Sequence, residues 1–252
     1  MELWHTLCLS AHCIIVSLLS VYGIHRYNLL KLYRRHRREK SEPDKKFSVL
    51  PPVTIQLPLY NEFHVAERAI EMATRLDYPR DRLRIQVLDD SNDQTQSLAV
   101  KCCTRLAQRG FNISYKHRNH RSGYKAGALA SGLKNIDSEF ILLLDADFIP
   151  PPDLLKRTIH HFSDPKVGMV QTRWGHLNRS HSLLTRIQSI FLDGHFVIEH
   201  TARSFSGRFF NFNGTAGIWR KEAIINSGGW EHDTLTEDLD LSYRAQLKGW
   251  KF

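Results

Sequence analysis

The sequence predicts an α/β protein with a doubly wound, mainly parallel sheet and one N-terminal transmembrane helix. Strand-like and helix-like segments alternate between residues 53 and 133, and repeated βα units favour a parallel sheet with right-handed crossovers. Five apolar residues in a row at 140–144 are typical of a strand that is buried on both faces. An apolar run near the N-terminus adds the membrane helix.

The N-terminal run extends from Leu7 to Ile24, and its roughly 18 residues are near the lower limit for crossing a bilayer. Six basic residues follow it: Arg26, Lys31, Arg34, Arg35, Arg37 and Arg38. The positive-inside rule places this basic side in the cytoplasm, whereas a cleaved signal peptide would carry its charge in front of the run. We therefore expect a membrane anchor at 1–25, and the alternative is a buried or interfacial helix.

Composition and charge narrow the possible functions of the chain that follows the apolar run. The 252 residues include 35 basic and 26 acidic ones, for a net charge of +9. The basic excess is concentrated early, so we expect a juxtamembrane linker at 26–47 that binds anionic lipid and no nucleic acid. Four cysteines without CxxC or zinc spacing indicate a reduced, cytosolic main domain at 48–252.

Two strand–loop–helix units open the main domain. The first has a strand from Val53 that runs into a turn at Tyr60 to Glu62, and then a helix with apolar residues between 65 and 76. The second has a strand at 83–88 that ends in acids, and a helix around 98–106. A short strand at 111–115 follows. These units predict the parallel part of the sheet.

A glycine- and alanine-rich helix begins near Gly123. Its small residues allow close packing, and Lys125 near its start is placed to bind a phosphate. The alternative is a solvated lysine.

Two acids, Asp145 and Asp147, follow the central strand. Residues two apart in a strand point to the same side, with Cα atoms roughly 6.6 Å apart. Such a pair can hold one hard divalent ion, and ligands of open α/β sheets bind beyond the carboxyl ends of the strands. The alternatives are a solvated loop and a phosphatase whose nucleophilic aspartate ends a strand.

The second half of the main domain has weaker patterns. We expect a helix after Asp153, a strand at 167–174, and a helix from 184 that continues toward His195 and His200. These histidines are five residues apart, about 140° around an α-helix, and therefore cannot share a zinc ion as an i, i+4 pair does. They line a groove or form a polar helix face.

The last part combines a glycine-containing loop with an acidic helix start. We expect the loop at 210–220 to let backbone approach a ligand closely. A helix at 221–226 follows, then Asp238 at the start of another helix, with a strand beginning near Trp250. The alternative for Asp238 is an N-cap carboxylate.

Seven segments occur in order on these elements: PLYNE, VLDDSND, GYKAGAL, LLLDADF, VQTRW, FNGTAG and TED. Together they resemble the family 2 glycosyltransferases of the processive, cellulose-synthase-like kind, with the wording of plant β-mannan synthases and their bacterial relatives. The resemblance covers about residues 48–252 and removes the phosphatase alternative. It implies the nucleotide-sugar-binding α/β arrangement called GT-A.

The resemblance also implies roles for individual residues. The base and ribose of the donor would contact five of them: Pro58, Tyr60, Glu62, Asp89 and Asp90. Lys125 would support the diphosphate, and Asp145 and Asp147 would hold Mg²⁺ or Mn²⁺ against it. Asp238, after Thr236 and Glu237, would be the general base of an inverting transfer, which takes the proton of the attacking acceptor hydroxyl. Four residues would border the sugar and acceptor: Trp174, His195, Asn213 and Gly214.

One departure from the family pattern concerns the C-terminus. The family's Gln-x-x-Arg-Trp motif and the later membrane helices of its export pore are absent, so we expect a fragment of a longer protein, with a natural truncation as the alternative.

The expected function is transfer of a hexose from GDP-mannose or UDP-glucose to a β-1,4-linked polysaccharide, in a membrane protein whose catalytic domain faces the cytoplasm at the plasma membrane or, in a eukaryote, the Golgi. The alternatives are a non-processive enzyme with a lipid acceptor and an inactive nucleotide-sugar-binding protein.

Overall fold

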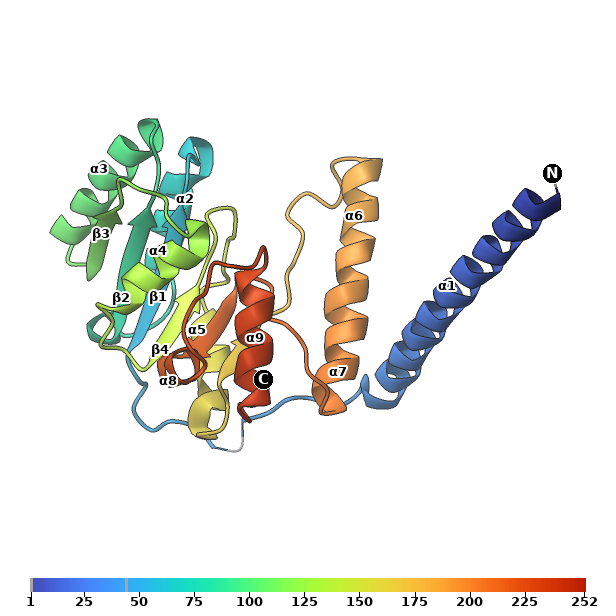
Figure 1. Cartoon of the computed structure of the whole chain (residues 1–252). Coiled ribbons are helices and arrows are strands. Elements are labelled where there is room, and N and C mark those ends of the chain that lie inside the picture. Colours follow the sequence, from blue (N-terminus) through green and yellow to red (C-terminus); the bar gives the residue numbers. More distant parts are fainter. Residues whose placement is uncertain (1, 44) are drawn as a thin grey trace. The chain divides into compact units, whose positions relative to one another are not determined.

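The computed structural model describes residues 2–43 and 45–252, which form two compact units (Figure 1). One unit comprises Met1–Lys40 and Arg173–Phe209, and the other comprises Ser41–Thr172 and Phe210–Phe252. The units therefore do not follow chain order, because residues 173–209 pack with the N-terminal helix. The expected division of the chain at residues 25 and 47 stays a prediction.

The larger unit contains a six-stranded sheet in the order β3-β2-β1-β4-β6-β5. Four strands are parallel: β1 (Val53–Leu59), β2 (Leu83–Asp89), β3 (Ile113–His117) and β4 (Phe140–Leu143). β6 (Gly217–Arg220) runs antiparallel to β4, and β5 (Met169–Gln171) runs antiparallel to β6. The predicted mainly parallel α/β sheet is confirmed. The strand expected at 167–174 is only three residues long, and β6 lies in a segment predicted to be a loop.

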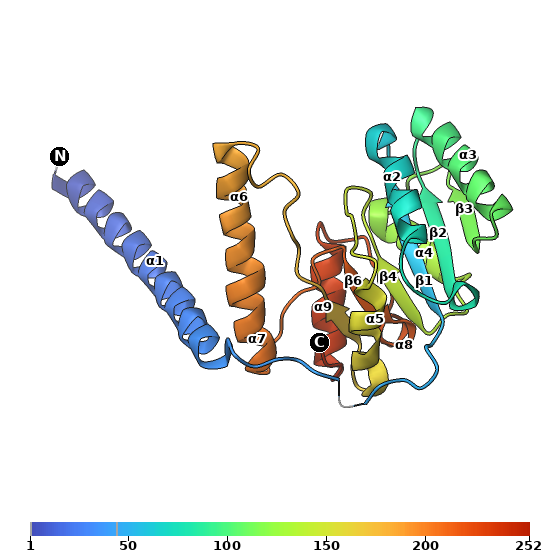
Figure 2. The ribbon, with the colours of Figure 1, turned by 180° about the vertical axis from the view of Figure 1, so that it is seen from behind.

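Helices cover both faces of the sheet. α2 (Phe63–Thr74) and α3 (Gln94–Gln108) pack on one face, and α4 (Tyr124–Leu133) packs on the other (Figures 1 and 2). The change of face follows from right-handed crossovers, since the chain moves outward from β1 to β3 and then returns to β4. A Cβ at Gly132 would lie 2.4 Å from Gln56 Nε2, so glycine allows α4 to approach the sheet as its composition predicts.

Shorter elements complete this unit: η1 (Arg80–Arg82), α5 (Leu154–Thr158), η2 (Ile159–Ser163), α8 (Lys221–Asn226) and α9 (Glu237–Leu247). Near the C-terminus, the expected strand is a single bridge between Val167 and Lys251. An aromatic cluster lies under α8 and α9, with the Trp219 ring centroid 5.8 Å from that of Phe212 and 6.0 Å from that of Trp230. Burial of such side chains contributes roughly 1.5–3 kcal/mol each, and Leu241 and Ala245 of α9 belong to the same core.

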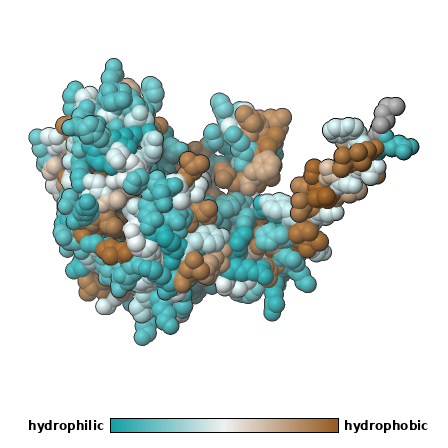
Figure 3. All heavy atoms as spheres, viewed as in Figure 1, coloured by the Kyte–Doolittle hydropathy of each residue, from teal (hydrophilic) through white to brown (hydrophobic). Residues whose placement is uncertain are grey.

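The smaller unit is helical. It contains α1 (Glu2–His36), α6 (Leu183–Asp193), the π-helical segment η3 (Gly194–His200) and α7 (Thr201–Phe205). By length and composition, α1 is a candidate membrane span, and Figure 3 shows hydrophobic residues gathered along it. The helix continues to His36, so part of the basic segment expected to be a linker is helical. Lysine and arginine are good helix formers and are favourable near a helix C-terminus.

Candidate active site

The carboxyl ends of β1, β2 and β4 lie at one edge of the sheet because these strands are parallel. Asp145 and Asp147 follow β4, as predicted, but β4 ends at Leu143. The Phe148 amide donates to the Asp145 carbonyl over 3.1 Å, which closes a turn. The strand geometry used to predict that the two carboxylates share a side was therefore wrong, although the pair is close enough for Asp147 to raise the pKa of Asp145.

Lys125 connects the turn that carries Asp145 and Asp147, which we call the aspartate turn, with the loop before β6. Its Nζ donates to Asp145 Oδ1 over 2.5 Å and to the Gly214 carbonyl over 3.0 Å. The Asp145 amide donates to the hydroxyl of Thr215 over 2.8 Å, and Thr215 is buried. The prediction missed Thr215, although the FNGTAG segment contains it. Lys125 is thus not a solvated surface lysine.

Gly214 lies between Lys125 and the start of α9. Its φ is +77°, and a Cβ there would lie 3.3 Å from Asp238 Oδ2 and 3.6 Å from Lys125 Nζ. The N-cap of α9 is Thr236, and Asp238 Oδ1 accepts from the Leu239 amide over 2.8 Å. The N-cap alternative for Asp238 is therefore wrong. The structure brings Lys125, Asp145, Gly214 and Asp238 together.

Glu62 also lies close to the aspartates. Burial raises its pKa to about 7, the charges of Asp145 and Asp147 add to this, and Lys125 opposes it. Burial also raises the pKa of Asp145, again against the effect of Lys125. In the described part of the chain, Glu62 Oε2 is buried without a hydrogen-bond partner. We call Glu62, Asp145, Asp147 and Asp238 the carboxylate cluster.

The carboxylate cluster fits a divalent cation. It places four acids around Lys125, and hard cations prefer carboxylate oxygens. Across residues 2–43 and 45–252, no group of three or more metal-ligating side chains is close enough to hold an ion alone. An ion held by Asp145 and Asp147 would therefore complete its coordination with oxygens from a ligand, as a magnesium or manganese ion does with phosphates.

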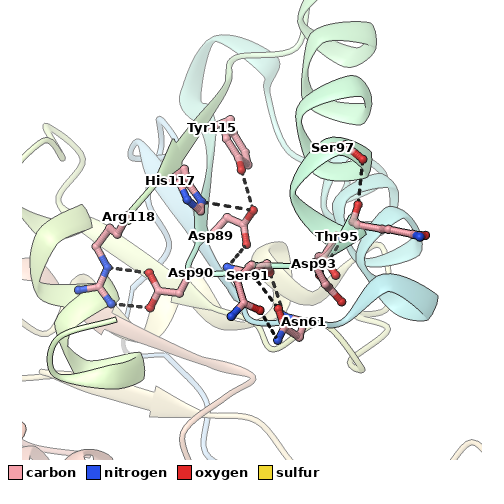
Figure 4. Close-up of polar contacts among 12 residues, drawn as sticks. Asn61, Asp89, Asp90, Ser91, Asp93, Thr95, Ser97, Tyr115, His117 and Arg118 are labelled. Atoms are coloured by element: carbon pink, nitrogen blue, oxygen red, sulfur yellow. Dashed lines mark hydrogen bonds and ion pairs between the residues drawn. The ribbon is translucent and has the colours of Figure 1, made fainter. Parts of the chain in front are cut away.

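Asp89, the last residue of β2, and Asp90, which follows it, have surroundings very different from those of the carboxylate cluster (Figure 4). Asp89 is fully buried and accepts from the Tyr115 hydroxyl over 2.6 Å and from the Ser91 amide over 2.9 Å. Asp90 accepts from Arg118 Nε over 2.7 Å and also pairs with Arg118 Nη2. These side chains hold the loops together.

The turn after β1 is joined to this network. Asn61 has a φ of +54°, a conformation that asparagine adopts more readily than most residues. Its amide donates to Ser91 Oγ over 2.9 Å, and its side chain exchanges hydrogen bonds with Asn92. This turn lies between Tyr60 and Glu62, while Pro58 lies within β1. The predicted contacts of Pro58, Tyr60, Glu62, Asp89 and Asp90 with a nucleoside stay predictions.

Gln171 at the end of β5 supports the loop before β6, and the prediction missed it. Its Oε1 accepts from the Asn213 amide over 3.0 Å, and its Nε2 donates to the carbonyls of Thr215 and Ala216. Asn213 Oδ1 accepts from Asn211 over 3.1 Å. Gln171 therefore positions the backbone that carries Gly214.

Trp174 and His195 belong to the smaller unit, so their predicted place at the sugar and acceptor stays a prediction. The Trp174 ring centroid lies 4.9 Å from that of Phe196. The centroids of His195 and His200 are 4.4 Å apart, although an α-helix would separate them by about 140°. The segment is π-helical, and its i→i+5 hydrogen bonding places residues five apart on one face. The helix assumption was wrong.

The Glu199 carboxylate lies among His195 and two arginines. Its Oε2 lies 3.5 Å from His195 Nδ1 and 3.0 Å from Arg26 Nη1, and its Oε1 lies 3.0 Å from Arg203 Nη2. The hydrogen bond with His195 lowers the pKa of Glu199 to about 2, against the effect of burial. Burial lowers the pKa of His200 to about 3. Glu199 is therefore charged and ties α1 to the π-helical segment.

Most of the chain is similar in sequence to known proteins. A family model described as "Glycosyltransferase like family 2" matches residues 51–252. Glucomannan 4-beta-mannosyltransferase 2 from Arabidopsis thaliana is 45% identical over 236 residues, which cover 89% of this chain and 44% of that protein. Probable glucomannan 4-beta-mannosyltransferase 6 from Oryza sativa subsp. japonica is 46% identical over 207 residues, covering 80% and 36%. The chain spans less than half the length of these curated relatives.

A solved structure shares the fold. It is the mannosyltransferase PcManGT from Pyrobaculum calidifontis in complex with GDP-Man and Mn²⁺, with a TM-score of 0.71 and 23% identity over 92% of this chain and 64% of that one. The structure of S. aureus TarS has a TM-score of 0.56 and 16% identity, covering 78% of this chain and 33% of that one. The predicted nucleotide-sugar-binding α/β arrangement is confirmed at the level of the fold.

Proposed function

The chain belongs to the glycosyltransferase-like family 2, and from this membership we propose that it carries the donor site of a membrane-bound, inverting mannosyltransferase that extends a β-1,4-linked polysaccharide from GDP-mannose. The carboxylate cluster with Lys125 carries this proposal, because four acids around one lysine match a metal–diphosphate site. The names of both plant relatives, which are glucomannan 4-beta-mannosyltransferases, favour mannose as the sugar.

Asp238 is proposed as the general base. It is the second residue of α9, and a helix N-terminus favours a negative charge on such a side chain. Its carboxylate accepts the proton of the acceptor hydroxyl as that oxygen attacks the anomeric carbon. Gly214 has no side chain, so it leaves open the space between Asp238 and Lys125. Thr236 is the N-cap of α9 and Glu237 is its first residue, and both are proposed to belong to the catalytic motif with Asp238.

The donor diphosphate is proposed to lie between Lys125 and the aspartate turn. A Mg²⁺ or Mn²⁺ ion held by Asp145 and Asp147 would neutralise charge on the departing nucleoside diphosphate. Lys125 pairs with Asp145 in the structure and donates to a diphosphate oxygen when the donor is bound. The proposed role of Glu62 is to add negative charge beside the two aspartates, which strengthens the site for a cation.

The proposed membrane attachment is supported by α1, a candidate membrane span by length and composition. We propose that α1 spans the bilayer with its basic last turn in the cytoplasm, where Arg34 and Arg35 contact anionic lipid head groups. The catalytic unit then works on the cytoplasmic side of the membrane, with a cytosolic nucleotide sugar as donor.

The test is transfer by the full-length protein in membranes supplied with radiolabelled GDP-mannose or UDP-glucose and Mn²⁺. We expect label from GDP-mannose in a polymer that is insoluble in chloroform–methanol and is digested by an endo-β-1,4-mannanase. A single labelled lipid would contradict the polysaccharide acceptor, and transfer from UDP-glucose alone would contradict the donor.

A further inference from the structure

The loop between β3 and α4 carries two arginines with opposite surroundings. Arg118 pairs with Asp90 through two nitrogens and donates to the carbonyls of Ser122 and Tyr124 over 3.1 and 3.0 Å. Arg121 is exposed. In the described ranges 2–43 and 45–252, no carboxylate lies within ion-pair distance of it. Arg118 is therefore part of the framework, whereas the donors of the Arg121 guanidinium are available.

Aromatic rings hold the Arg121 side chain in place. Its guanidinium carbon lies 3.4 Å from the ring centroid of Tyr60 and 5.1 Å from that of Tyr124. These rings are 36% and 66% exposed. Tyr60 follows β1 and comes two residues before Glu62 of the carboxylate cluster. Arg121 thus covers an accessible aromatic face beside the proposed donor site.

The backbone that carries Arg121 is closely packed on α4 and hydrogen-bonded to Arg118. A Cβ at Gly127 would lie 2.1 Å from the Ser122 carbonyl and 2.8 Å from Arg118 Nη1, so glycine lets the loop lie directly on α4. Gly123 and Tyr124 both have positive φ, at +70° and +48°, and Arg118 donates to the carbonyls of this turn. The Arg121 side chain can therefore change position while its backbone stays in place.

We propose that Arg121 recognises the guanine of the donor. In this inference, which rests on the proposed function, the base stacks on the Tyr60 face that Arg121 covers, and the displaced guanidinium donates two hydrogen bonds to guanine O6 and N7. No ring fits into the 3.4 Å between Arg121 and Tyr60, so a base that reaches Tyr60 must displace the guanidinium.

Two energetic arguments support this exchange. A cation–π contact at an exposed site is weak compared with the stacking of a base on an aromatic side chain. The base therefore replaces the guanidinium on the ring of Tyr60. The planar guanidinium matches the O6 and N7 acceptors of guanine, which is its commonest specific base contact. Uracil lacks this pair of acceptors. Arg121 is therefore a specificity-determining residue that favours a GDP-sugar over a UDP-sugar.

Calorimetric titration of the full chain in detergent, with Mn²⁺ present, tests this. The ligands are GDP, 7-deaza-GDP, which lacks the N7 acceptor, and UDP. The proteins are the parent, Arg121→Ala, Arg121→Lys and the control Arg109→Ala, which changes an exposed arginine after α3. We expect Arg121→Ala to bind GDP about 10- to 100-fold more weakly and to lose the difference between GDP and 7-deaza-GDP that the parent shows.

The lysine variant separates base recognition from charge. Arg121→Lys keeps the positive charge but not the planar pair of donors, so we expect it to lose the preference for GDP over 7-deaza-GDP, while Arg109→Ala behaves like the parent. Two results for Arg121→Ala would overturn the recognition of guanine. One is an equal loss of affinity for GDP and for UDP, and the other is a difference in affinity between GDP and 7-deaza-GDP that is as large as in the parent. Absence of any nucleotide binding by the parent would overturn the proposed function as well.

Discussion

Two pairs of aspartates lie at the carboxyl ends of β2 and β4, two parallel strands on either side of β1, yet their surroundings are opposite. Asp89 and Asp90 at the end of β2 are buried, and they accept hydrogen bonds from Tyr115, Ser91 and Arg118. Asp145 and Asp147 after β4 share one lysine with two further carboxylates. The first pair has all the partners it needs within the protein, whereas the second carries an excess of negative charge. A satisfied pair stabilises the fold, and an unsatisfied one is placed to bind a cation and its ligand.

Asp238→Asn should have the largest effect on the carboxylate cluster. Loss of the general base should lower transfer by roughly 100- to 10,000-fold, with GDP affinity nearly unchanged, because the amide keeps the shape of the side chain. Steady-state kinetics and GDP titration measure the two effects. Asp233→Asn, an exposed change shortly before α9, is the control. Normal transfer by the Asp238 variant would remove Asp238 as the base.

Arg118→Ala tests the satisfied pair. It leaves the buried Asp90 carboxylate without its partner, so we expect a loss of about 3 kcal/mol in the free energy of unfolding. Chemical denaturation measures it, with Arg109→Ala as the control. The comparison between the two pairs fails if Arg118→Ala is as stable as that control.

Tyr115→Phe makes a smaller change in the same network. It removes the hydroxyl that donates to the fully buried Asp89, and loss of a hydrogen bond to a charged group costs about 2 kcal/mol. Thermal unfolding should show the loss, and GDP affinity should change little. A variant with unchanged stability but much weaker GDP binding would place the Asp89 network in the donor site itself.

Glu62→Gln should have the smallest effect on stability, and above pH 7 it should raise the free energy of unfolding rather than lower it. The folded pKa of Glu62 is raised from 4.5 to about 7, so between these pH values the folded protein holds a proton that the unfolded chain releases. Stability therefore falls as pH rises through this window, and above pH 7 the glutamine variant should be more stable by about 1 kcal/mol, allowing for solvent. Unfolding measured from pH 4.5 to pH 8 with a chelator tests this, and an equally steep decline in the variant would contradict it.

The sequence predicted the parts of the fold with strong local patterns. β4 is a wholly apolar strand, β1 and β2 are rich in apolar residues and end in turns, and the small residues of α4 indicated its close packing. β6 escaped prediction because it is short and glycine-flanked, and its strand form depends on pairing with β4 and β5. The π-helical segment escaped because helical periodicity assumes an α-helix.

The candidate site was predicted as a set of residues rather than as a geometry. The acids and Lys125 were found by their positions after strands and at a helix start. The pairing of Asp90 with Arg118, which lies 28 residues away, depends on the packing of β2 beside β3 and has no local pattern. Thr215 and Gln171 act through backbone groups, which residue types alone do not reveal.

The most direct test of the central claim is GDP titration of the full chain with Mn²⁺ and with a chelator, in the parent and in Asp147→Asn. The claim is that the carboxylate cluster after β4 holds the metal–diphosphate. It predicts Mn²⁺-dependent GDP binding in the parent and in the control Asp137→Asn, an exposed change before β4, and no Mn²⁺ dependence in Asp147→Asn. Equal, Mn²⁺-dependent affinity in all three proteins would contradict it.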